Sequence, residues 1–125
     1  MPTTHPAPQA IARAYFEAMA SKNVEGILAV CDENMICDSP LGHLDGIQHF
    51  RGFHEGFARM IEKLTLKAVH GDDKQAVIVY VADTLPVKVA FVAEYFTIAK
   101  GKITSVRVIY DGVPFAQYAA SAQAH

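Results

Sequence analysis

Residues 88–111 read KVAFVAEYFTIAKGKITSVRVIYD, and this stretch decides the fold class. Residue types that favour strands fill both sides of Lys100-Gly101, a pair that is typical of a tight turn. The pattern therefore predicts two antiparallel strands, Lys88–Ala99 and Lys102–Asp111, that are joined as a hairpin.

Upstream of this hairpin, the hydrophobic period changes from 3.6 to 2 after Leu64. The segments with helical periodicity predict three helices, at residues 8–21, 24–31 and 47–64. The short apolar or alternating segments predict three strands, at residues 35–39, 66–70 and 75–84, and residues 40–46 are expected to form a loop. Helices that precede antiparallel strands indicate an α+β fold, in which three N-terminal helices pack on one face of a curved, mostly antiparallel sheet.

The composition is that of a small globular domain. The chain has 125 residues, of which 51% are hydrophobic, and its formal net charge is −2. We expect one domain over residues 1–125, with flexible tails at 1–7 and 118–125. The small net charge argues against nucleic acid as a partner, and no run of roughly 18 apolar residues suggests a membrane span. Two cysteines form no disulfide framework, so a reducing cytoplasm is the expected location.

Strand parity within residues 88–99 singles out one carboxyl group. One face carries Ala90, Val92, Glu94, Phe96 and Ile98, and the other carries Val89, Phe91, Ala93, Tyr95 and Thr97. If the first face points inward, burial raises the pKa of Glu94 and favours the neutral acid, which can donate a hydrogen bond. The alternative is that this face meets solvent or a dimer partner and that Glu94 is solvated.

Three other residues combine a reactive group with a suggestive position. Tyr15 lies on the buried stripe of the first helix, Asp38 ends the first strand, and Asp111 closes the last strand. Each has an ordinary structural explanation as well: a core tyrosine, a turn aspartate before Ser-Pro, and a turn aspartate before glycine. Parity also predicts that Asp111 and Tyr110 cannot both point inward unless the strand bulges.

The order of elements and several short motifs resemble the nuclear transport factor 2-like superfamily, in its SnoaL-like and ketosteroid-isomerase-like branch. The motifs are Asp38-Ser39-Pro40-Leu41-Gly42, the helix start at Gly46, Gly101-Lys102-Ile103 and Tyr110-Asp111, and the resemblance runs from about Gln9 to Gln117. It implies a cone-shaped α+β barrel with an apolar pocket, often dimeric through the outer face of its sheet. Members include isomerases, epoxide hydrolases, polyketide cyclases, dehydratases and binding proteins without chemistry.

The resemblance to ketosteroid isomerase implies a catalytic set. Asp38 matches that family's general base, although one inserted residue separates it from the proline. Tyr15 matches the tyrosine of the oxyanion hole, and Glu94 falls near the protonated aspartate that donates a hydrogen bond to the enolate oxygen. In ketosteroid isomerase, that aspartate stays neutral near pH 7 because its site is apolar. The implied activity is cofactor-free proton transfer beside the carbonyl of a small hydrophobic compound.

Two other functions stay open at this stage. In the first, Asp111 is the centre of a polyketide cyclase or an epoxide-hydrolase-like enzyme, because a similar strand ending carries the catalytic aspartate in such proteins. In the second, the domain holds an apolar ligand and performs no chemistry. Exposure of both Asp38 and Glu94 to solvent would favour the second.

The expected ligand is a small hydrophobic molecule. The residues that we expect to line its pocket are Phe16, Met19, Phe50, His54, Phe57, Phe96, Val108 and Tyr110. No metal is expected, because His49 and His54 are five residues apart, whereas a helical zinc pair needs a spacing of four. An apolar outer face with Phe91 and Tyr95 predicts a homodimer.

Overall fold

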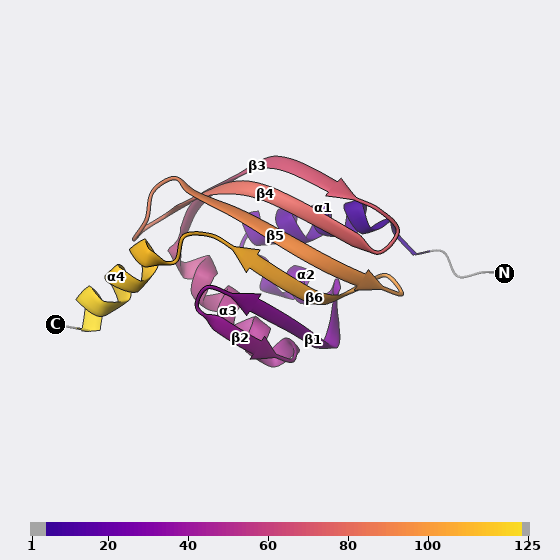
Figure 1. Ribbon diagram of the computed structural model, residues 1–125, viewed down its shortest axis with the longest axis horizontal. Coiled ribbons are helices and arrows are strands. Elements are labelled where there is room, and N and C mark those ends of the chain that lie inside the picture. Colours follow the sequence, from indigo (N-terminus) through magenta and orange to yellow (C-terminus); the bar gives the residue numbers. More distant parts are fainter. Residues whose placement is uncertain (1–4, 124–125) are drawn as a thin grey trace.

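Six strands form one curved sheet in the order β2-β1-β6-β5-β4-β3 (Figure 1). The computed structural model describes residues 5–123. The strands are β1 (Cys31–Ser39), β2 (Gly42–Asp45), β3 (Ile61–Gly71), β4 (Gln75–Thr84), β5 (Ala90–Ala99) and β6 (Lys102–Ile109). Neighbouring strands are antiparallel except β1 and β6, which run parallel.

The helices are α1 (Pro8–Ala20), α2 (Val24–Leu28), α3 (Ile47–Met60) and α4 (Val113–Gln123). Helix α1 contacts β3 and β4, α3 contacts β1 and β2, and α2 contacts both α1 and α3. Helix α4 leaves the end of β6 and projects from the body of the molecule (Figure 1). Within residues 5–123, no helix is both long and apolar enough to cross a membrane.

The β5–β6 hairpin forms as the sequence predicts. Lys100 and Gly101 have φ values of 53° and 78°, and two successive residues with positive φ are what a tight type I′ hairpin turn requires. Side chains then alternate along β5, so that Val92, Glu94 and Phe96 face the helices. The predicted α+β class, with helices on one face of a curved sheet, is confirmed.

The core fills the space between this face and the first three helices. Its largest fully buried side chains include Tyr15, Met19, Phe50, Tyr80 and Phe96. They come from α1, α3, β4 and β5, so the core joins the helices to the centre of the sheet. Burial of such side chains is the main favourable contribution to folding.

Several predicted boundaries were wrong in the first half of the chain. Cys31 begins β1 rather than ending the second helix, and β2 lies within the predicted loop. Residues 61–64 belong to β3 rather than to the third helix. Strand β3 shifts register between Ile61 and Lys63 and again between Leu66 and Ala68. These shifts interrupt the period of two, so the start of β3 looks helical in sequence.

The C-terminal segment also differs from the prediction. Strand β6 ends at Ile109, short of the predicted end at Asp111, and residues 113–123 form α4, which takes in residues 118–123 of the predicted flexible tail. The Asp111 carboxylate accepts a hydrogen bond of 3.0 Å from the Val113 N–H, and proline follows in the first turn, where its missing N–H costs nothing. Residues 1–4 and 124–125 of the predicted tails lie outside the described residues.

Candidate active site

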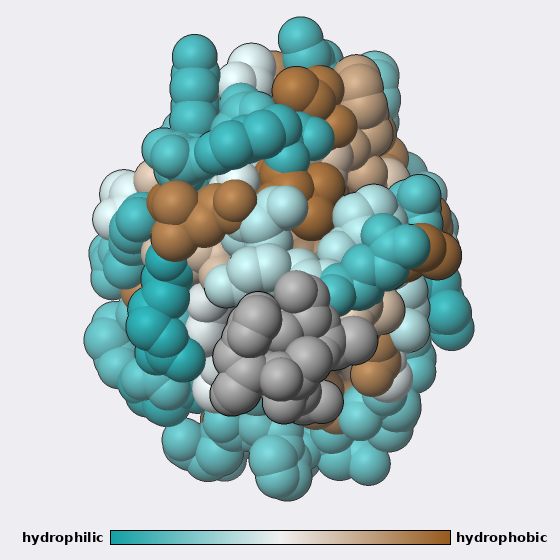
Figure 2. All heavy atoms as spheres, turned by 90° about the vertical axis from the view of Figure 1, so that its left-hand side faces the viewer, coloured by the Kyte–Doolittle hydropathy of each residue, from teal (hydrophilic) through white to brown (hydrophobic). Residues whose placement is uncertain are grey.

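A cavity of about 360 Å³ lies beside the end of β6 and the start of α4, because Tyr110 and Phe115 are among its lining residues. It lies between the second half of α3 and the inner face of β4, β5 and β6. The described residues that line it are Leu41, Gly52, Phe53, His54, Gly56, Phe57, Met60, Tyr80, Ala82, Val92, Glu94, Val108, Tyr110 and Phe115. Figure 2 looks onto this end of the molecule and shows hydrophobic side chains set among hydrophilic ones. Most of the lining is apolar, and Glu94 is the one carboxylic acid among these residues.

Glu94 is buried and hydrogen-bonded at both of its carboxylate oxygens. Its side chain is 2% exposed. The Tyr15 hydroxyl donates to Oε1 over 2.7 Å, and the Tyr80 hydroxyl donates to Oε2 over 2.5 Å. Two charge-assisted hydrogen bonds of this length hold the carboxylate in one orientation.

Three elements bring these groups together. Glu94 lies in the middle of β5, where its register partners are Ile78 on β4 and Val108 on β6. Tyr80 is two residues beyond Ile78, so it points to the same face of the sheet. Tyr15 reaches the pair from the buried stripe of α1.

The surroundings of Glu94 favour its protonated form. Burial raises the pKa of Glu94 to about 7, although the hydrogen bonds from Tyr80 and Tyr15 act in the opposite direction. Both the acid and its conjugate base are therefore populated near neutral pH. A group with such a pKa can accept a proton and return it, which is the requirement for a general acid–base catalyst.

His54 extends this network on the side of α3. Its Nε2 lies 2.7 Å from the Tyr15 hydroxyl oxygen, and its ring is 2% exposed. Burial lowers the pKa of His54 to about 3, so the imidazole is neutral. When Tyr15 donates its single proton to Glu94, Nε2 of His54 must carry the proton that it shares with Tyr15. Nδ1 is then a bare acceptor, and among the described residues it has no hydrogen-bond partner.

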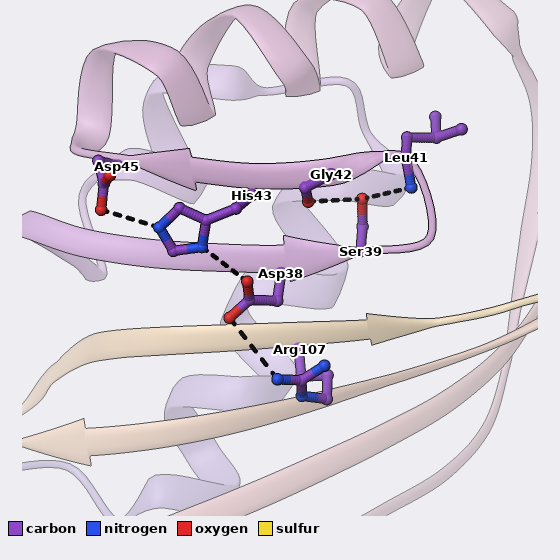
Figure 3. A network of polar contacts seen from close by, with 7 residues as sticks. All are labelled: Asp38, Ser39, Leu41, Gly42, His43, Asp45 and Arg107. Atoms are coloured by element: carbon purple, nitrogen blue, oxygen red, sulfur yellow. Dashed lines mark hydrogen bonds and ion pairs between the residues drawn. The ribbon is translucent and has the colours of Figure 1, made fainter.

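Asp38 is not among the residues that line the cavity, and its carboxylate instead belongs to a polar cluster with His43 and Arg107 (Figure 3). Its carboxylate lies on the outer face of the sheet, where His43 Nδ1 is 2.6 Å away and the Arg107 guanidinium is 3.7 Å away. A second ring nitrogen of His43 is 3.0 Å from Asp45, and these two carboxylates raise the pKa of His43. The buried neighbour in the strand is Cys37, so Asp38 points outward, and the expectation of a pocket-facing carboxylate at this position was wrong.

Asp111 also lies outside the cavity lining. It is exposed, and its carboxylate accepts a hydrogen bond from the Val113 N–H at the start of α4. Tyr110, by contrast, lines the cavity, and its ring packs edge-on against Phe115 at a centroid distance of 5.3 Å. The two neighbours therefore point to different sides, as parity predicted for this strand ending.

The eight predicted pocket residues divide into two groups. His54, Phe57, Val108 and Tyr110 line the cavity. Phe16, Met19, Phe50 and Phe96 are buried in the core instead and are not among the residues that line it. Tyr80 was missed, although its position between Ile78 and Ala82 on the apolar parity of β4 could have indicated an inward hydroxyl.

The curved sheet that packs on helices is the fold of solved nuclear transport factor 2-like proteins. A protein of that type from Cytophaga hutchinsonii superposes with a TM-score of 0.77 at 19% identity, over 93% of this chain and 99% of that one. The model of the SnoaL-like domain matches residues 12–106. The chain belongs to the SnoaL-like domain family.

Two further solved structures are similar to the chain. A protein from Kribbella flavida is 30% identical, with a TM-score of 0.87 over 95% of this chain and 98% of that one. A candidate polyketide cyclase from Pseudomonas putida is 20% identical, with a TM-score of 0.73 over 90% of this chain and 97% of that one. A comparison with curated protein sequences finds no match.

Proposed function

We propose that the cavity binds a small hydrophobic carbonyl compound and that Glu94 transfers a proton on it without a cofactor. The observation that carries this proposal is a buried carboxyl group, held by two tyrosine hydroxyls, on the wall of an otherwise apolar cavity. The apolar lining suits a hydrophobic ligand, and the single acid suits a reaction that moves one proton. The general base is thus Glu94 rather than Asp38.

The proton transfer has two steps. The Glu94 carboxylate takes a proton from the carbon beside the carbonyl, the C–H electron pair becomes the new C=C bond, and the carbonyl π pair moves to oxygen. The Glu94 carboxylic acid then returns the proton. Return to the same carbon regenerates the ketone, and return to the far carbon of a conjugated enolate gives an isomer with a shifted double bond. Each carboxylate oxygen keeps a second lone pair beside its tyrosine bond and can accept this proton.

Tyr110 supplies a hydroxyl for the enolate oxygen. It lines the same cavity as Glu94, and burial raises its pKa, so the hydroxyl keeps its proton. A hydrogen-bond donor directed at the oxygen where charge develops stabilises the transition state of such a reaction. The Tyr15 and Tyr80 hydroxyls donate to the Glu94 carboxylate and orient it. Each hydroxyl has one proton, so neither can also donate to the enolate oxygen.

The test is exchange of α-protons in D2O, followed by proton NMR on small cyclic ketones such as cyclohexanone and decalone. We expect the protein to catalyse saturable exchange above the buffer rate. Asp38→Asn is the matched control, and it should keep the wild-type rate within about twofold, because a surface change away from the site has little effect. Absence of catalysed exchange across the ketones, with binding retained, would instead support a ligand-binding protein without chemistry.

We also propose that two copies associate through the outer face of the sheet. Phe91 and Ile109 are 62% and 54% exposed there, and Tyr95 lies beside them on β5. Helices α1 to α3 pack on the opposite face, so among the described elements none covers these side chains. An exposed apolar surface of this kind is typical of an interface.

Sedimentation at micromolar concentration is expected to show a dimer. Phe91→Lys should weaken it at least about tenfold, since burial of a phenylalanine contributes roughly 1.5–3 kcal/mol. Leu85→Lys is the matched control, because Leu85 is 64% exposed but lies in the β4–β5 connection. A wild-type monomer at this concentration, or equal effects of the two variants, would contradict the proposal.

A further inference from the structure

The Tyr80 hydroxyl has two acceptors within reach. Oε2 of Glu94 lies 2.5 Å from this hydroxyl oxygen, and Sδ of Met19 lies 3.7 Å from it. Met19 comes from α1 and is 1% exposed. A thioether sulfur is a weak acceptor, and the burial of Met19 shields this one from bulk solvent.

When Glu94 is ionised, the direction of every hydrogen bond around it is determined. Tyr15 and Tyr80 each donate to one carboxylate oxygen, and Nε2–H of His54 donates to the Tyr15 oxygen. In this state the sulfur of Met19 receives no strong hydrogen bond.

When Glu94 takes a proton and no ligand is in the cavity, the new O–H needs an acceptor, and the side chains bonded to Glu94 offer two. When the proton is on Oε1, the new O–H donates a hydrogen bond to the Tyr15 oxygen. The Tyr15 hydroxyl would then turn and donate to Nε2 of His54. His54 would then carry its proton on Nδ1, a buried atom that has no partner among the described residues. An orphaned buried donor is unfavourable, so this route is disfavoured.

The second route leaves no orphaned donor. When the proton is on Oε2, the new O–H donates a hydrogen bond to the Tyr80 oxygen. The Tyr80 hydroxyl then turns and donates to the sulfur of Met19. Tyr15 and His54 keep the hydrogen bonds of the ionised state. We propose that Met19 is a positioning residue, which accepts a hydrogen bond from the Tyr80 hydroxyl whenever Glu94 is protonated and thereby stabilises the acid form. This deepens the proposed function and rests on it, because a group that shuttles a proton must be stable in both forms.

The other titratable groups around Glu94 are neutral. Burial raises the pKa of both Tyr15 and Tyr80 well above the ordinary value and lowers that of His54 to about 3. On β1, burial and the charge of Glu94 raise the pKa values of Cys31 and Cys37 to about 12. Within the described residues, the proton position on Glu94 is thus set by hydrogen bonds rather than by a neighbouring charge.

The test is a double-mutant cycle that measures the pKa of Glu94 by carbon NMR of labelled glutamate, with the signal assigned from its loss in Glu94→Gln. Met19→Leu removes the sulfur and should lower this pKa by roughly 0.5, about a threefold change in the ionisation constant. In a Tyr80→Phe background, Met19→Leu should leave the pKa unchanged, because no hydroxyl remains to turn. Met35→Leu is the matched control, since Met35 is equally buried, at 1% exposed.

Equal shifts from Met19→Leu in both backgrounds would assign the effect to packing and overturn the proposal, as would no shift in either. If Met19→Leu does not fold, norleucine in place of the methionines keeps the unbranched shape, removes sulfur and allows the same comparison with and without the Tyr80 hydroxyl. No ketone is present in these measurements. Their outcome is therefore separate from whether the protein catalyses exchange.

Discussion

Replacing Glu94 with glutamine is expected to reduce catalysed α-proton exchange by about 10²–10⁴-fold, the contribution typical of a general base. The glutamine amide has nearly the size of the carboxylate and can accept a bond from one of the two tyrosines. It cannot take up a proton from carbon, so the first step of the reaction is lost. Binding of the ketone should change little, because the apolar lining of the cavity stays in place.

Glu55→Gln is the matched control for this experiment. Glu55 follows His54 on α3 but is exposed, so the same chemical change there should leave the exchange rate as it is. Circular dichroism of both variants checks that the fold is retained. Exchange by Glu94→Gln within tenfold of the wild-type rate would contradict the role of Glu94.

Glu94 and His54 are expected to have opposite and nearly cancelling effects on the pH dependence of stability. The pKa of Glu94 is raised to about 7 in the folded state, so folded protein binds the extra proton, and this contribution is present at low pH and lost as the pH rises through 7. The pKa of His54 is lowered to about 3, so the unfolded chain binds the extra proton there. That contribution is present above the unfolded pKa of about 6.5 and falls as the pH is lowered.

Urea unfolding between pH 6.5 and 4.5 measures this balance. Glu94→Gln leaves the His54 effect uncompensated and should lose about 2 kcal/mol more stability than the wild type on acidification over this range. His54→Phe leaves the Glu94 effect uncompensated, so its free energy of unfolding should rise by a similar amount relative to the wild type over the same acidification. Exposed groups such as His43 titrate alike in all three proteins and cancel in the difference. Parallel curves for wild type and Glu94→Gln would show that Glu94 has an ordinary pKa.

Much of the site depends on strand parity, which is visible in the sequence where alternation is regular. Burial alternates along β5, Ala90–Ala99, and the structure buries Glu94 on the predicted inner face. Parity was not visible around Asp38, where the resemblance to a known motif includes one inserted residue. Because side chains alternate with a period of two, one residue moves a side chain to the other face of a sheet. The structure accordingly places Asp38 beside Arg107, on the outside.

Other features depend on contacts between distant segments and have little local signal. The Tyr80 hydroxyl matters because β4 lies beside β5 and because Met19 of α1 packs against it, and neither neighbour is encoded near Tyr80 in the chain. The register shifts of β3 depend on its pairing with β4. The sequence predicts the class of such elements well, because period and turn residues are local, whereas register is a property of two segments.

The parallel pairing of β1 with β6 has a consequence for how the protein is made. Strands β1 and β6 are separated in the chain by β2, α3, β3, β4 and β5, so this pairing closes a very long loop. Such non-local contacts slow folding, because chain entropy is lost before the contacts form. On the ribosome, the growing chain cannot complete the wall of the cavity at Val108 until nearly all the residues described here have been synthesised. Until then the apolar side chains of β1 and β5 remain available to chaperones or to aggregation.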